Sequence, residues 1–444
     1  WLAQRVERCM TKRSVNIGLC GLGTVGQGVI ELLAEGGDVL RTRVGADIAL
    51  RHCATRTPKP EINTLGATES RDVFAVAQDP EVDVLVELIG GTTVAKDLVV
   101  AALEQGKHVV TANKALLAEH GETLFALAEA KGLTLRFEAA VAGGIPIIET
   151  VKSSLATNHV TSIAGIINGT GNFILTEMAA KGREFADVLE EAQALGYAEA
   201  DPTFDVDGTD AAQKLVLLAS LAFGQRIDVA SVFKQGVDSV SPTDIDYARE
   251  LGFCIKHLGI AKRQGSAIEL RVHPTLIPKS KAIAQVDGVL NAVMINASGV
   301  GELLLVGPGA GSRPTASAVT ADIAAIALSI AKGDQPSALN MGIPLAYFST
   351  ASIVDIDHVS SSWYLRLEAE DTPGAMAAIT QCLSERDIGI ASLIQKLDSP
   401  DVQRVPVVLL TDNASTAAIA SAMKAIEALP SVGGQVTSLR VEYF

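Results

Sequence analysis

The chain has 444 residues, of which 48% are hydrophobic and only 4% aromatic, and its formal net charge at pH 7 is −15. This length accommodates roughly two to four domains with cores of their own, and the aliphatic composition suits α/β layers better than a sandwich or a barrel. The acidic balance excludes nucleic acid as the main partner, because no surplus of Lys and Arg is available to neutralise phosphates.

The chain shows no signal for a membrane or an oxidising compartment. Residues 1–19 contain charges and no apolar stretch long enough for a signal peptide, and no uninterrupted run of about 18 apolar residues predicts a membrane span. Residues 1–9, ahead of Met10, are interpreted as an added or variable extension. The cysteines form no disulfide framework and no zinc motif, which predicts reduced thiols in a cytoplasmic protein. They are Cys9, Cys20, Cys53, Cys254 and Cys382.

Strands and helices alternate over the N-terminal part of the chain. The stretch "SVNIGLCGLGTVGQGVIELLAEG" opens with an apolar strand, passes a glycine-dense turn and enters an amphipathic helix. Strands follow at 47–56 and 83–91, and the order helix, glycine stop and strand then recurs twice. This alternation predicts an α/β domain at 10–148 with a parallel sheet, of the Rossmann type that binds dinucleotides. The Ala-rich helix within 310–335 is expected to pack back on this domain.

The pattern changes at about residue 149. Residues 149–309 mix helices with longer strands that look more exposed, which predicts a second, α+β domain. Its helices are expected around 150–155, 185–195 and 209–224, and its strands in "VTSIAGIIN", "SAIELRVHPTLIP" and "NAVMINASG". The stretch 336–360, rich in Ser, Pro and Asp, is expected to be a linker. Residues 361–444 predict a complete βαββαβ domain, with strands at 363–369, 388–396, 404–411 and 434–443 and helices at 373–386 and 414–428.

The turn after the first strand has G-x-G-x-x-G spacing. A dinucleotide site needs a tight turn there, a close backbone approach to the pyrophosphate and a helix N-terminus that faces the anion. Such a motif also occurs as a plain glycine-rich turn in other α/β proteins, so its place between strand and helix carries the prediction. The predicted cofactor-binding turn consists of Gly21, Leu22, Gly23, Thr24, Val25 and Gly26.

Other cofactor contacts are expected where further strands of this sheet end. The second strand ends in "CATRTPKP", with Arg56 and no acid among residues 48–60. A cation there favours the 2′-phosphate of NADP, but Arg56 could equally be a solvated loop charge, so NAD stays open. Gly90 follows the third strand and Lys114 the next one, at the edge where the crevice holds the nicotinamide end.

A lysine follows a concentration of carboxylates in "EADPTFDVDGTDAAQKLVLLAS" (199–220). If a helix begins near residues 207–209, Asp210 and Lys214 lie at i and i+4 and share a face. The rest of this helix is almost entirely apolar, and such a helix is normally buried. A lysine held partly out of water and oriented by a carboxylate has the environment of a general acid. A surface ion pair is the alternative, and it predicts polar neighbours that are absent.

The acids ahead of this helix are expected to lie in a loop punctuated by Pro and Gly. Loop acids are usually just solvated. A concentration of them beside a buried lysine could also bind an ammonium group or a cation, which suits a substrate with an α-amino group. These residues are Glu199, Asp201, Asp205 and Asp207.

Together these residues resemble the homoserine dehydrogenase family, in its longer bacterial form with a C-terminal ACT domain. The similar stretches follow the family's order from residue 15 to about 330, and they are "GLGTVG", "VELIGG", "HVVTANK", "FEAAVAGGIPI", "GIINGTGNFILT", "LGYAEADPTFDVDGTDAAQKL" and "GPGAGSRPTASAV". The tail resembles an ACT module through its D-x-P-G turn. The resemblance implies NAD(P)-dependent interconversion of L-aspartate 4-semialdehyde and L-homoserine. It also implies a substrate-binding and dimerisation role for the second domain, a homodimer or homotetramer, and threonine as an effector.

The resemblance also implies roles for single residues. Lys214 matches the proton donor to the carbonyl oxygen, Asp210 its partner acid, and Lys114 the lysine between nicotinamide and substrate. The implied substrate contacts are Glu199, Asp205, Tyr197 and Lys114, with Glu199 receiving the amino group. Gly309 is implied to touch the cofactor. A sodium site built largely from main-chain carbonyls is implied at Glu138, Val141, Gly143 and Ile145.

Two other interpretations stay open. Another amino-acid dehydrogenase of the same architecture would keep the glycine turn but not the whole pattern from Glu199 to Lys214. A non-catalytic, amino-acid-sensing ACT protein would lack Lys114, Lys214 or the glycines, and all of these are present.

Overall fold

The computed structural model describes residues 14–396 and 404–444, so residues 1–9, interpreted above as an extension, lie outside the described part. The chain divides into two compact units. Unit 1 consists of the described residues up to 163 together with 212–231 and 290–351, and unit 2 consists of 164–211, 232–289 and the described residues from 352 onward. The division into three domains with the boundaries given above stays a prediction.

Unit 1 is built on a parallel sheet with the strand order β3-β2-β1-β4-β5-β6. Its strands are β1 (Val15–Cys20), β2 (Ile48–Ala54), β3 (Thr68–Ser70), β4 (Val84–Glu87), β5 (His108–Thr111) and β6 (Leu135–Arg136). The chain changes direction across the sheet at β1 and β4, and the carboxyl ends of such strands border the crevice in which doubly wound sheets bind ligands. The predicted Rossmann-type sheet is confirmed.

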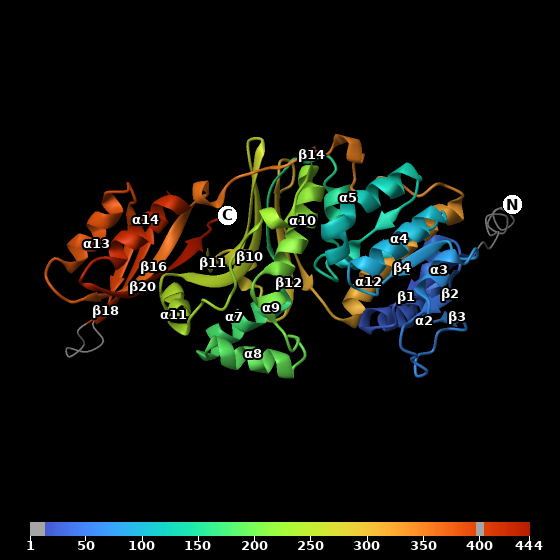
Figure 1. Ribbon diagram of the computed structural model, residues 1–444, viewed down its shortest axis with the longest axis horizontal. Coiled ribbons are helices and arrows are strands. Elements are labelled where there is room, and N and C mark those ends of the chain that lie inside the picture. The colour runs from blue at the N-terminus through green and yellow to red at the C-terminus, as the bar shows by residue number, and fades with distance from the viewer. Residues whose placement is uncertain (1–13, 397–403) are drawn as a thin grey trace. The chain divides into compact units, whose positions relative to one another are not determined.

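Helices cover both faces of this sheet. They are α2 (Thr24–Val44), α3 (Val73–Gln78), α4 (Thr93–Glu104), α5 (Lys114–Ala130) and α12 (Ser312–Lys332). Ile17 and Leu19 of β1 belong to a core cluster with residues of α2 and α12. Gly18, between them, faces Val76 of α3, so α3 lies on the opposite face. As expected for 310–335, α12 packs against α2 (Figure 1).

Among the described helices, α12 alone is long and apolar enough to cross a membrane. Its apolar side is part of the core of unit 1, where Ala316, Val319 and Ile323 are fully buried. A core helix buried on one side against a sheet accounts for this composition.

The rest of unit 1 surrounds the sheet. It includes the short helices η1 (Glu138–Ala140) and α6 (Ile147–Glu149), the π-helical turn η2 (Thr150–Ser154), and the antiparallel pair β12 (Leu290–Ala297) and β13 (Gly301–Pro308). β14 (Ser349–Thr350) pairs with β8 (Gln225–Arg226), and η5 (Leu345–Tyr347) precedes it. Helix α10 (Thr209–Phe223) begins in unit 2 and continues in unit 1.

The segment predicted as a linker, 336–360, is in part fixed to unit 1. The Thr134 hydroxyl donates to the carbonyl of Ser337 (2.8 Å), and the Leu135 amide donates to Asn340 Oδ1 (2.8 Å). Asn340 is buried. Residues 337–340 are therefore held against the edge of the Rossmann-type sheet at β6 by side-chain hydrogen bonds.

Unit 2 contains a mixed sheet with the order β10-β11-β20-β16-β18-β17. These strands are β10 (Phe253–Gln264), β11 (Ala267–Pro278), β16 (Ser360–Glu370), β17 (Ile390–Gln395), β18 (Arg404–Thr411) and β20 (Val432–Val441). Short strands add to it, with β9 (Phe233–Lys234) and β15 (Ser352–Ile353) beside β11 and β19 (Ala414–Ser415) beside β16. Strand β7 (Val160–Ile166) runs from unit 1 into unit 2.

The helices of unit 2 pack on this sheet. They are α7 (Gly169–Lys181), α8 (Phe185–Ala194), α9 (Thr203–Val206), α11 (Pro242–Glu250), α13 (Ala375–Ser384) and α14 (Thr416–Glu427), with the short 3-10 turns η4 (Ala282–Gln285) and η6 (Ile356–His358). The 3-10 turn η3 (Val229–Ser231) belongs to unit 1. The predicted βαββαβ order of the tail is confirmed in β16, α13, β17, β18, α14 and β20.

The expectation that the strands of the middle segment are exposed is wrong. β11 is buried along its length except at its two end residues, and β12 is mostly buried. The reason lies in the sheet order, because β11 has β10 on one side and the C-terminal strand β20 on the other. A strand in the middle of a sheet that is covered by helices has no solvated face.

Candidate functional site

The glycine turn between β1 and α2 has the geometry that a pyrophosphate requires. Gly21 has a φ of +104°, and a Cβ there would lie 2.4 Å from the Leu88 carbonyl oxygen. A Cβ on Gly26 would lie 2.1 Å from the Gly21 carbonyl oxygen, whereas one on Gly23 would meet nothing within 4 Å. The first and third glycines therefore close the turn, and the second leaves open space above the helix.

The start of α2 is suited to an anion. Gly23 is its N-cap, no side chain caps the first turn, and no acidic residue lies there. Free backbone N–H groups of Thr24, Val25 and Gly26 at a helix start attract a negative charge. This donor set fits the pyrophosphate of a dinucleotide.

A buried glutamate organises the loops at the ends of β4 and β5. The Glu87 carboxylate is fully buried and accepts hydrogen bonds from the Ile89 amide (2.9 Å), the Gly90 amide (3.3 Å) and the Thr111 hydroxyl (2.6 Å). Burial raises the pKa of this carboxyl, against the effect of these hydrogen bonds. Asn113 donates to the Gly91 carbonyl (2.7 Å) and caps α5. The loop around Gly90 and the start of α5, where Lys114 lies, are thus fixed to each other.

Two other predicted cofactor residues lie in loops of unit 1. Arg56 is exposed just after β2. Gly309 follows β13, and its carbonyl oxygen would be 2.4 Å from a Cβ on Gly143. The Gly144 amide also donates to the Pro308 carbonyl (3.0 Å). The loop of Gly309 therefore lies against the loop predicted to bind sodium.

The predicted sodium loop, residues 138–145, is tightly folded. Ala142 and Gly143 both have positive φ, at 55° and 52°, so the backbone reverses between Val141 and Ile145. The Glu138 carboxylate accepts from the Ile148 and Glu149 amides (2.8 Å each), and burial, with the charge of Asp322, raises its pKa to about 7. Because this carboxylate already serves the start of α6, backbone oxygens are the donors that fit a hard cation here.

Asn168 brings two of the predicted substrate-site acids together in unit 2. Its Nδ2 donates to Asp205 Oδ1 (2.9 Å) and to Asp210 Oδ2 (2.8 Å), and its Oδ1 accepts from the Gly171 amide (2.7 Å) at the start of α7. Asn168 and Asp210 are both buried. Thr170 adds hydrogen bonds to the Tyr197 carbonyl (2.7 Å) and to Asp205 (3.4 Å). One buried amide therefore fixes the orientation of both carboxylates.

The other acids of the segment 199–207 are not gathered in the same way. Asp205 lies in the short helix α9, so the whole cluster is not a loop as expected. Asp201 accepts hydrogen bonds from Thr203, and Asp207 accepts from the amide (2.8 Å) and hydroxyl (2.8 Å) of Thr209 at the start of α10. Each of these acids accepts hydrogen bonds from the first residue of the helix that follows it, Thr203 of α9 or Thr209 of α10, which gives it a structural role. Glu199 is exposed.

Tyr197, which the resemblance implies as a substrate contact, is fixed by its ring. The ring packs edge-on against that of Phe173, with a centroid distance of 5.1 Å, and the residue is 45% exposed. Its free edge is therefore available at the surface of unit 2 near the Thr170 and Asp205 contacts.

The helix that carries Lys214 begins at Thr209, as predicted. Asp210 is buried and Lys214 is half-buried one turn later, and residues 215–219 are buried without interruption. The expected apolar surroundings of Lys214 along its own helix are therefore present. Lys114 is the first residue of α5 and is also half-buried.

Comparison with known proteins identifies the family. Residues 21–138 match the family model described as homoserine dehydrogenase, NAD binding domain, and residues 146–324 match the model described as homoserine dehydrogenase. A curated homoserine dehydrogenase of Pseudomonas aeruginosa is 48% identical over 430 residues, which cover 97% of this chain and 99% of that protein. The chain belongs to the homoserine dehydrogenase family. It is accordingly an oxidoreductase of amino-acid biosynthesis with an NAD-binding Rossmann domain, as the sequence resemblance implied.

Solved homoserine dehydrogenase structures agree with this assignment. The crystal structure from Thiobacillus denitrificans has a TM-score of 0.92 at 43% identity and covers 97% of this chain and 99% of that one. A hyperthermophilic archaeal homoserine dehydrogenase in complex with NADPH has a TM-score of 0.60 at 26% identity, with coverage of 70% of this chain and 97% of that one. Part of this chain therefore has no counterpart in the shorter archaeal relative.

The residues that hold the site in shape have only weak signals in the sequence. Asn168 lies in "GIINGTGN" and Glu87 in "VELIGG", two stretches that were matched to the family as a whole without a role for the side chain. A signal for Glu87 existed, because an acid inside an apolar strand is rarely buried without hydrogen-bond donors. Asn168 gave a weaker signal, since Asn before a helix is usually only a cap.

Proposed function

We propose that this homoserine dehydrogenase interconverts L-aspartate 4-semialdehyde and L-homoserine with Lys214 as the general acid. The observation that carries the proposal is the i, i+4 placement of Asp210 and Lys214 on one face of α10, with Asp210 buried and hydrogen-bonded by Asn168. A fixed carboxylate one helical turn away orients the lysine side chain. The half-buried position of Lys214 reduces competition from water.

When bound, the reduced dinucleotide would supply the hydride that converts the aldehyde carbon to an alcohol. Lys214 gives its proton to the carbonyl oxygen as negative charge develops there, and it regains a proton from solvent afterwards. An ammonium aimed at that oxygen stabilises the transition state more than the neutral aldehyde. Lys114, at the start of α5, adds a second positive charge, and its place is set by the Glu87 and Asn113 hydrogen bonds. Glu199 and Asp205 receive the substrate's amino group, with Tyr197 beside them.

The test is the substitution Lys214→Ala, with Lys332→Ala, an exposed lysine at the end of α12, as the matched control. We expect kcat of Lys214→Ala to fall by about two to four orders of magnitude, the usual contribution of general acid catalysis. Dinucleotide affinity, measured by fluorescence titration, should stay within about twofold, because the glycine turn is untouched. A Lys214→Ala enzyme with near-normal turnover would remove this residue from the mechanism.

We propose NADP as the preferred cofactor. Arg56 is exposed just after β2, and residues 48–60 contain no acid to bind a ribose hydroxyl. The archaeal relative crystallised with NADPH supports the use of this cofactor in the family. Arg56→Ala is expected to raise KM for NADPH about tenfold and leave KM for NADH unchanged. Equal effects on both cofactors would show that Arg56 does not contact the 2′-phosphate.

We propose a sodium ion in the loop 138–145, bound by the main-chain oxygens of Glu138, Val141, Gly143 and Ile145. The reversed backbone at Ala142 and Gly143 and the prior engagement of the Glu138 carboxylate favour carbonyl donors. The loop lies against the loop of Gly309, so an ion here would stabilise a cofactor-binding segment. Replacing NaCl by the chloride of a large organic cation should then weaken dinucleotide binding, measured by titration.

We propose that the C-terminal βαββαβ segment, predicted at 361–444, is an ACT domain through which threonine inhibits the enzyme. Its sheet is joined to the rest of unit 2, because β20 pairs with β11. The sheet also contacts α11, because the Tyr364 hydroxyl (3.0 Å) and Arg366 Nε (2.6 Å) both donate to the buried carboxylate of Asp244. A ligand in this segment can therefore act on the substrate-binding unit through buried contacts.

A truncation is a poor test of this regulation, because removal of β20 would also remove Glu442, which pairs with the buried Arg271 (2.6 Å). We instead expect Tyr364→Phe to weaken inhibition by threonine while basal kcat stays normal. Initial rates with and without threonine, beside threonine binding by calorimetry, measure this. An intact enzyme that never responds to threonine would leave the segment an assembly element only.

We propose a cytoplasmic homodimer or homotetramer. Among the described strands, β13 pairs with β12 alone, and Val306 on it is 47% exposed. An apolar edge strand of this kind is suited to association with a second copy. The mass in solution, measured by light scattering after size-exclusion chromatography, distinguishes the two states, and a monomer would exclude both.

A further inference from the structure

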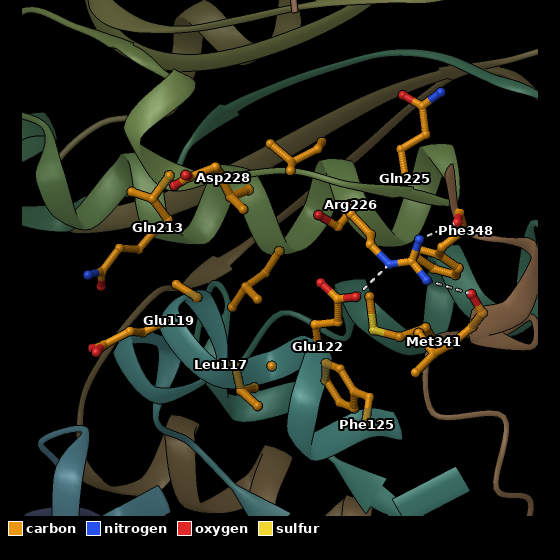
Figure 2. Close-up of a pocket in the computed structure, with 18 of the residues that line it drawn as sticks. Leu117, Glu119, Glu122, Phe125, Gln213, Gln225, Arg226, Asp228, Met341 and Phe348 are labelled. Carbon is orange, nitrogen blue, oxygen red and sulfur yellow. Dashed lines mark hydrogen bonds and ion pairs between the residues drawn. The ribbon is translucent and has the colours of Figure 1, made fainter. Parts of the chain in front are cut away.

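Unit 1 contains a cavity of about 690 Å³ that the proposed reaction does not use. It lies between α5 and α10, and residues 225–229 and 341–350 also line it (Figure 2). We call it the α5–α10 groove. Its volume lies in the range of small-molecule binding sites, and all of its lining residues belong to unit 1.

Small residues and one spanning side chain keep the groove open. The residues of α5 that line it include Ala115, Ala118 and Gly121, and helices that meet through small residues normally pack closely. Here Arg226 Nε pairs with Glu122 of α5 (2.8 Å), and its Nη1 donates to the Phe348 carbonyl (2.7 Å). Arg226, just after the end of α10, therefore links α5 and the segment 341–350 across one end of the groove (Figure 2).

The polar lining carries a surplus of negative charge. Glu119, Glu122 and Asp228 line the groove, against the single cation Arg226. The guanidinium of Arg226 is already engaged by Glu122 and by the carbonyls of Phe348 and Leu345. A ligand carboxylate would thus find no available cation among the lining residues, whereas a ligand cation would find the exposed carboxylate of Glu119, which lies 3.3 Å from His120 Nε2.

Gln213 gives the groove a hydrogen-bond acceptor. Its side-chain oxygen is buried and has no hydrogen-bond partner within the described residues. A buried amide oxygen left without a donor costs roughly 1–3 kcal/mol, which a ligand N–H would recover. The side chains of Gln213 and Glu119 lie toward the same end of the groove in Figure 2, and Phe125, Met341 and Phe348 lie toward the other.

We propose that the α5–α10 groove binds a small molecule made of a protonated amine on an apolar chain. The ammonium group lies between Gln213 and Glu119, and the chain follows the apolar lining toward Phe125. The side chains along that path are Leu117, Val216, Leu217, Met341 and Phe348. An amino acid is a poor ligand, because its carboxylate has no partner there.

The groove also adjoins residues of the proposed reaction. Thr92 lines it and follows Gly90 and Gly91, Ala115 lines it and follows Lys114, and Gln213 lines it and precedes Lys214. An amine bound in the groove is therefore expected to change kcat and to leave the affinity for homoserine unchanged. This consequence rests on the proposed function, whereas the binding itself does not.

The experiment uses the full-length enzyme and 1-hexylamine at pH 7, where the amine is protonated, with binding measured by calorimetry. We expect 1-hexylamine to bind, and 1-hexanol and hexanoate to bind at least tenfold more weakly, since only the ammonium meets Gln213 and Glu119. From butylamine to hexylamine, affinity should rise about threefold to fourfold for each methylene that is buried. Equal binding of the amine and the alcohol would overturn the proposal.

Matched variants locate the ligand. Ala118→Leu fills the groove from α5, whereas Ala126→Leu makes the same change on an exposed position of that helix. Glu119→Gln removes a charge from the groove, and Glu104→Gln removes one from the exposed end of α4. We expect Ala118→Leu to abolish binding and Glu119→Gln to weaken it about tenfold, with both controls unchanged.

Competition separates this site from the active site. Saturating homoserine should leave hexylamine affinity unchanged, and Lys214→Ala should bind hexylamine like the wild type even if its turnover is lost. Displacement of the amine by homoserine, or equal binding to Ala118→Leu and Ala126→Leu, would place the amine elsewhere and refute the proposal.

Discussion

Asn168→Asp is the substitution that most directly tests how the substrate-site acids are held. The change keeps the size and the position of the side chain. It also keeps the cap of α7, because Asp and Asn serve equally well as N-caps. It removes the two hydrogen bonds that Asn168 Nδ2 donates to Asp205 (2.9 Å) and Asp210 (2.8 Å). It also places a third carboxyl group beside the carboxylates of Asp205 and Asp210.

The expected cost follows from these contacts. Hydrogen bonds to a charged acceptor contribute about 1.5–3 kcal/mol each, so loss of both predicts about 3–6 kcal/mol of lost stability at neutral pH. Repulsion raises the pKa of the introduced carboxyl above its unfolded value of about 3.9. The variant is therefore least stable at high pH, and part of the loss is recovered as the pH falls through the raised pKa.

Urea unfolding between pH 5 and pH 8 measures this effect. Trp363, buried in β16 of unit 2, reports on the unit that contains Asn168, in a Trp1→Phe background, and far-ultraviolet circular dichroism reports on both units, including unit 1 with the control residue. Asn158→Asp is the control, because Asn158 Oδ1 only accepts hydrogen bonds, from the amides of Gly299 (2.8 Å) and Val300 (3.0 Å). A carboxylate can accept both, so this variant should stay within about 0.5 kcal/mol of the wild type.

The same variant also tests the function of the pair. Misplacement of Asp210 should lower kcat/KM by at least tenfold at pH 7.5, while dinucleotide affinity stays normal. The reasoning fails if Asn168→Asp is as stable as Asn158→Asp at pH 8, or if its loss of stability does not shrink on acidification.

Two further predictions concern the glycine turn and the C-terminal strand. Gly26→Ala should destabilise unit 1 and abolish dinucleotide binding, because its Cβ would lie 2.1 Å from the Gly21 carbonyl oxygen, whereas Gly23→Ala should fold normally and lose only cofactor affinity. Thermal unfolding and fluorescence titration separate these outcomes, and equal stability of the two variants would contradict the geometry. Burial alone would raise the pKa of the Glu442 carboxyl, but Arg271 and Lys262 hold it below its ordinary value. Its contribution is therefore complete above the unfolded pKa of about 4.3 and is lost as the pH falls through the lower folded pKa. Glu442→Gln should flatten the acid side of the urea-unfolding profile, and an unchanged profile would show that this pair does not contribute.

Much of the fold could be predicted because its elements have strong local signals. The sequence pattern places the strand, glycine turn and helix at β1 and α2 within a few residues. It does the same for β16, α13, β17, β18, α14 and β20. What could not be predicted is how strands from distant segments pair. β11 looks like an exposed strand by its polar residues, yet Arg271 and Glu269 are buried, because Arg271 pairs both with Glu269 and with Glu442, far along the chain. Charge pairing across that distance leaves no periodic trace in the sequence.

In the candidate site too, contacts between residues close in the sequence could be predicted, and contacts between distant residues could not. Lys214 and Asp210 share one helix, so their spacing alone places them on one face. Asn168 is brought to Asp205 and Asp210 only by the packing of α7 against α9, and its sequence context is that of an ordinary N-cap. The side chain in fact serves three partners at once, with its oxygen on the Gly171 amide and its nitrogen on two carboxylates. An amide is the one neutral side-chain group that can accept a hydrogen bond from the Gly171 amide and also donate to two carboxylates. A carboxylate at this position would keep the helix start and repel the acids, and a hydroxyl would reach only one of them. Asn168 is therefore required by the arrangement of its partners, which only the folded chain reveals.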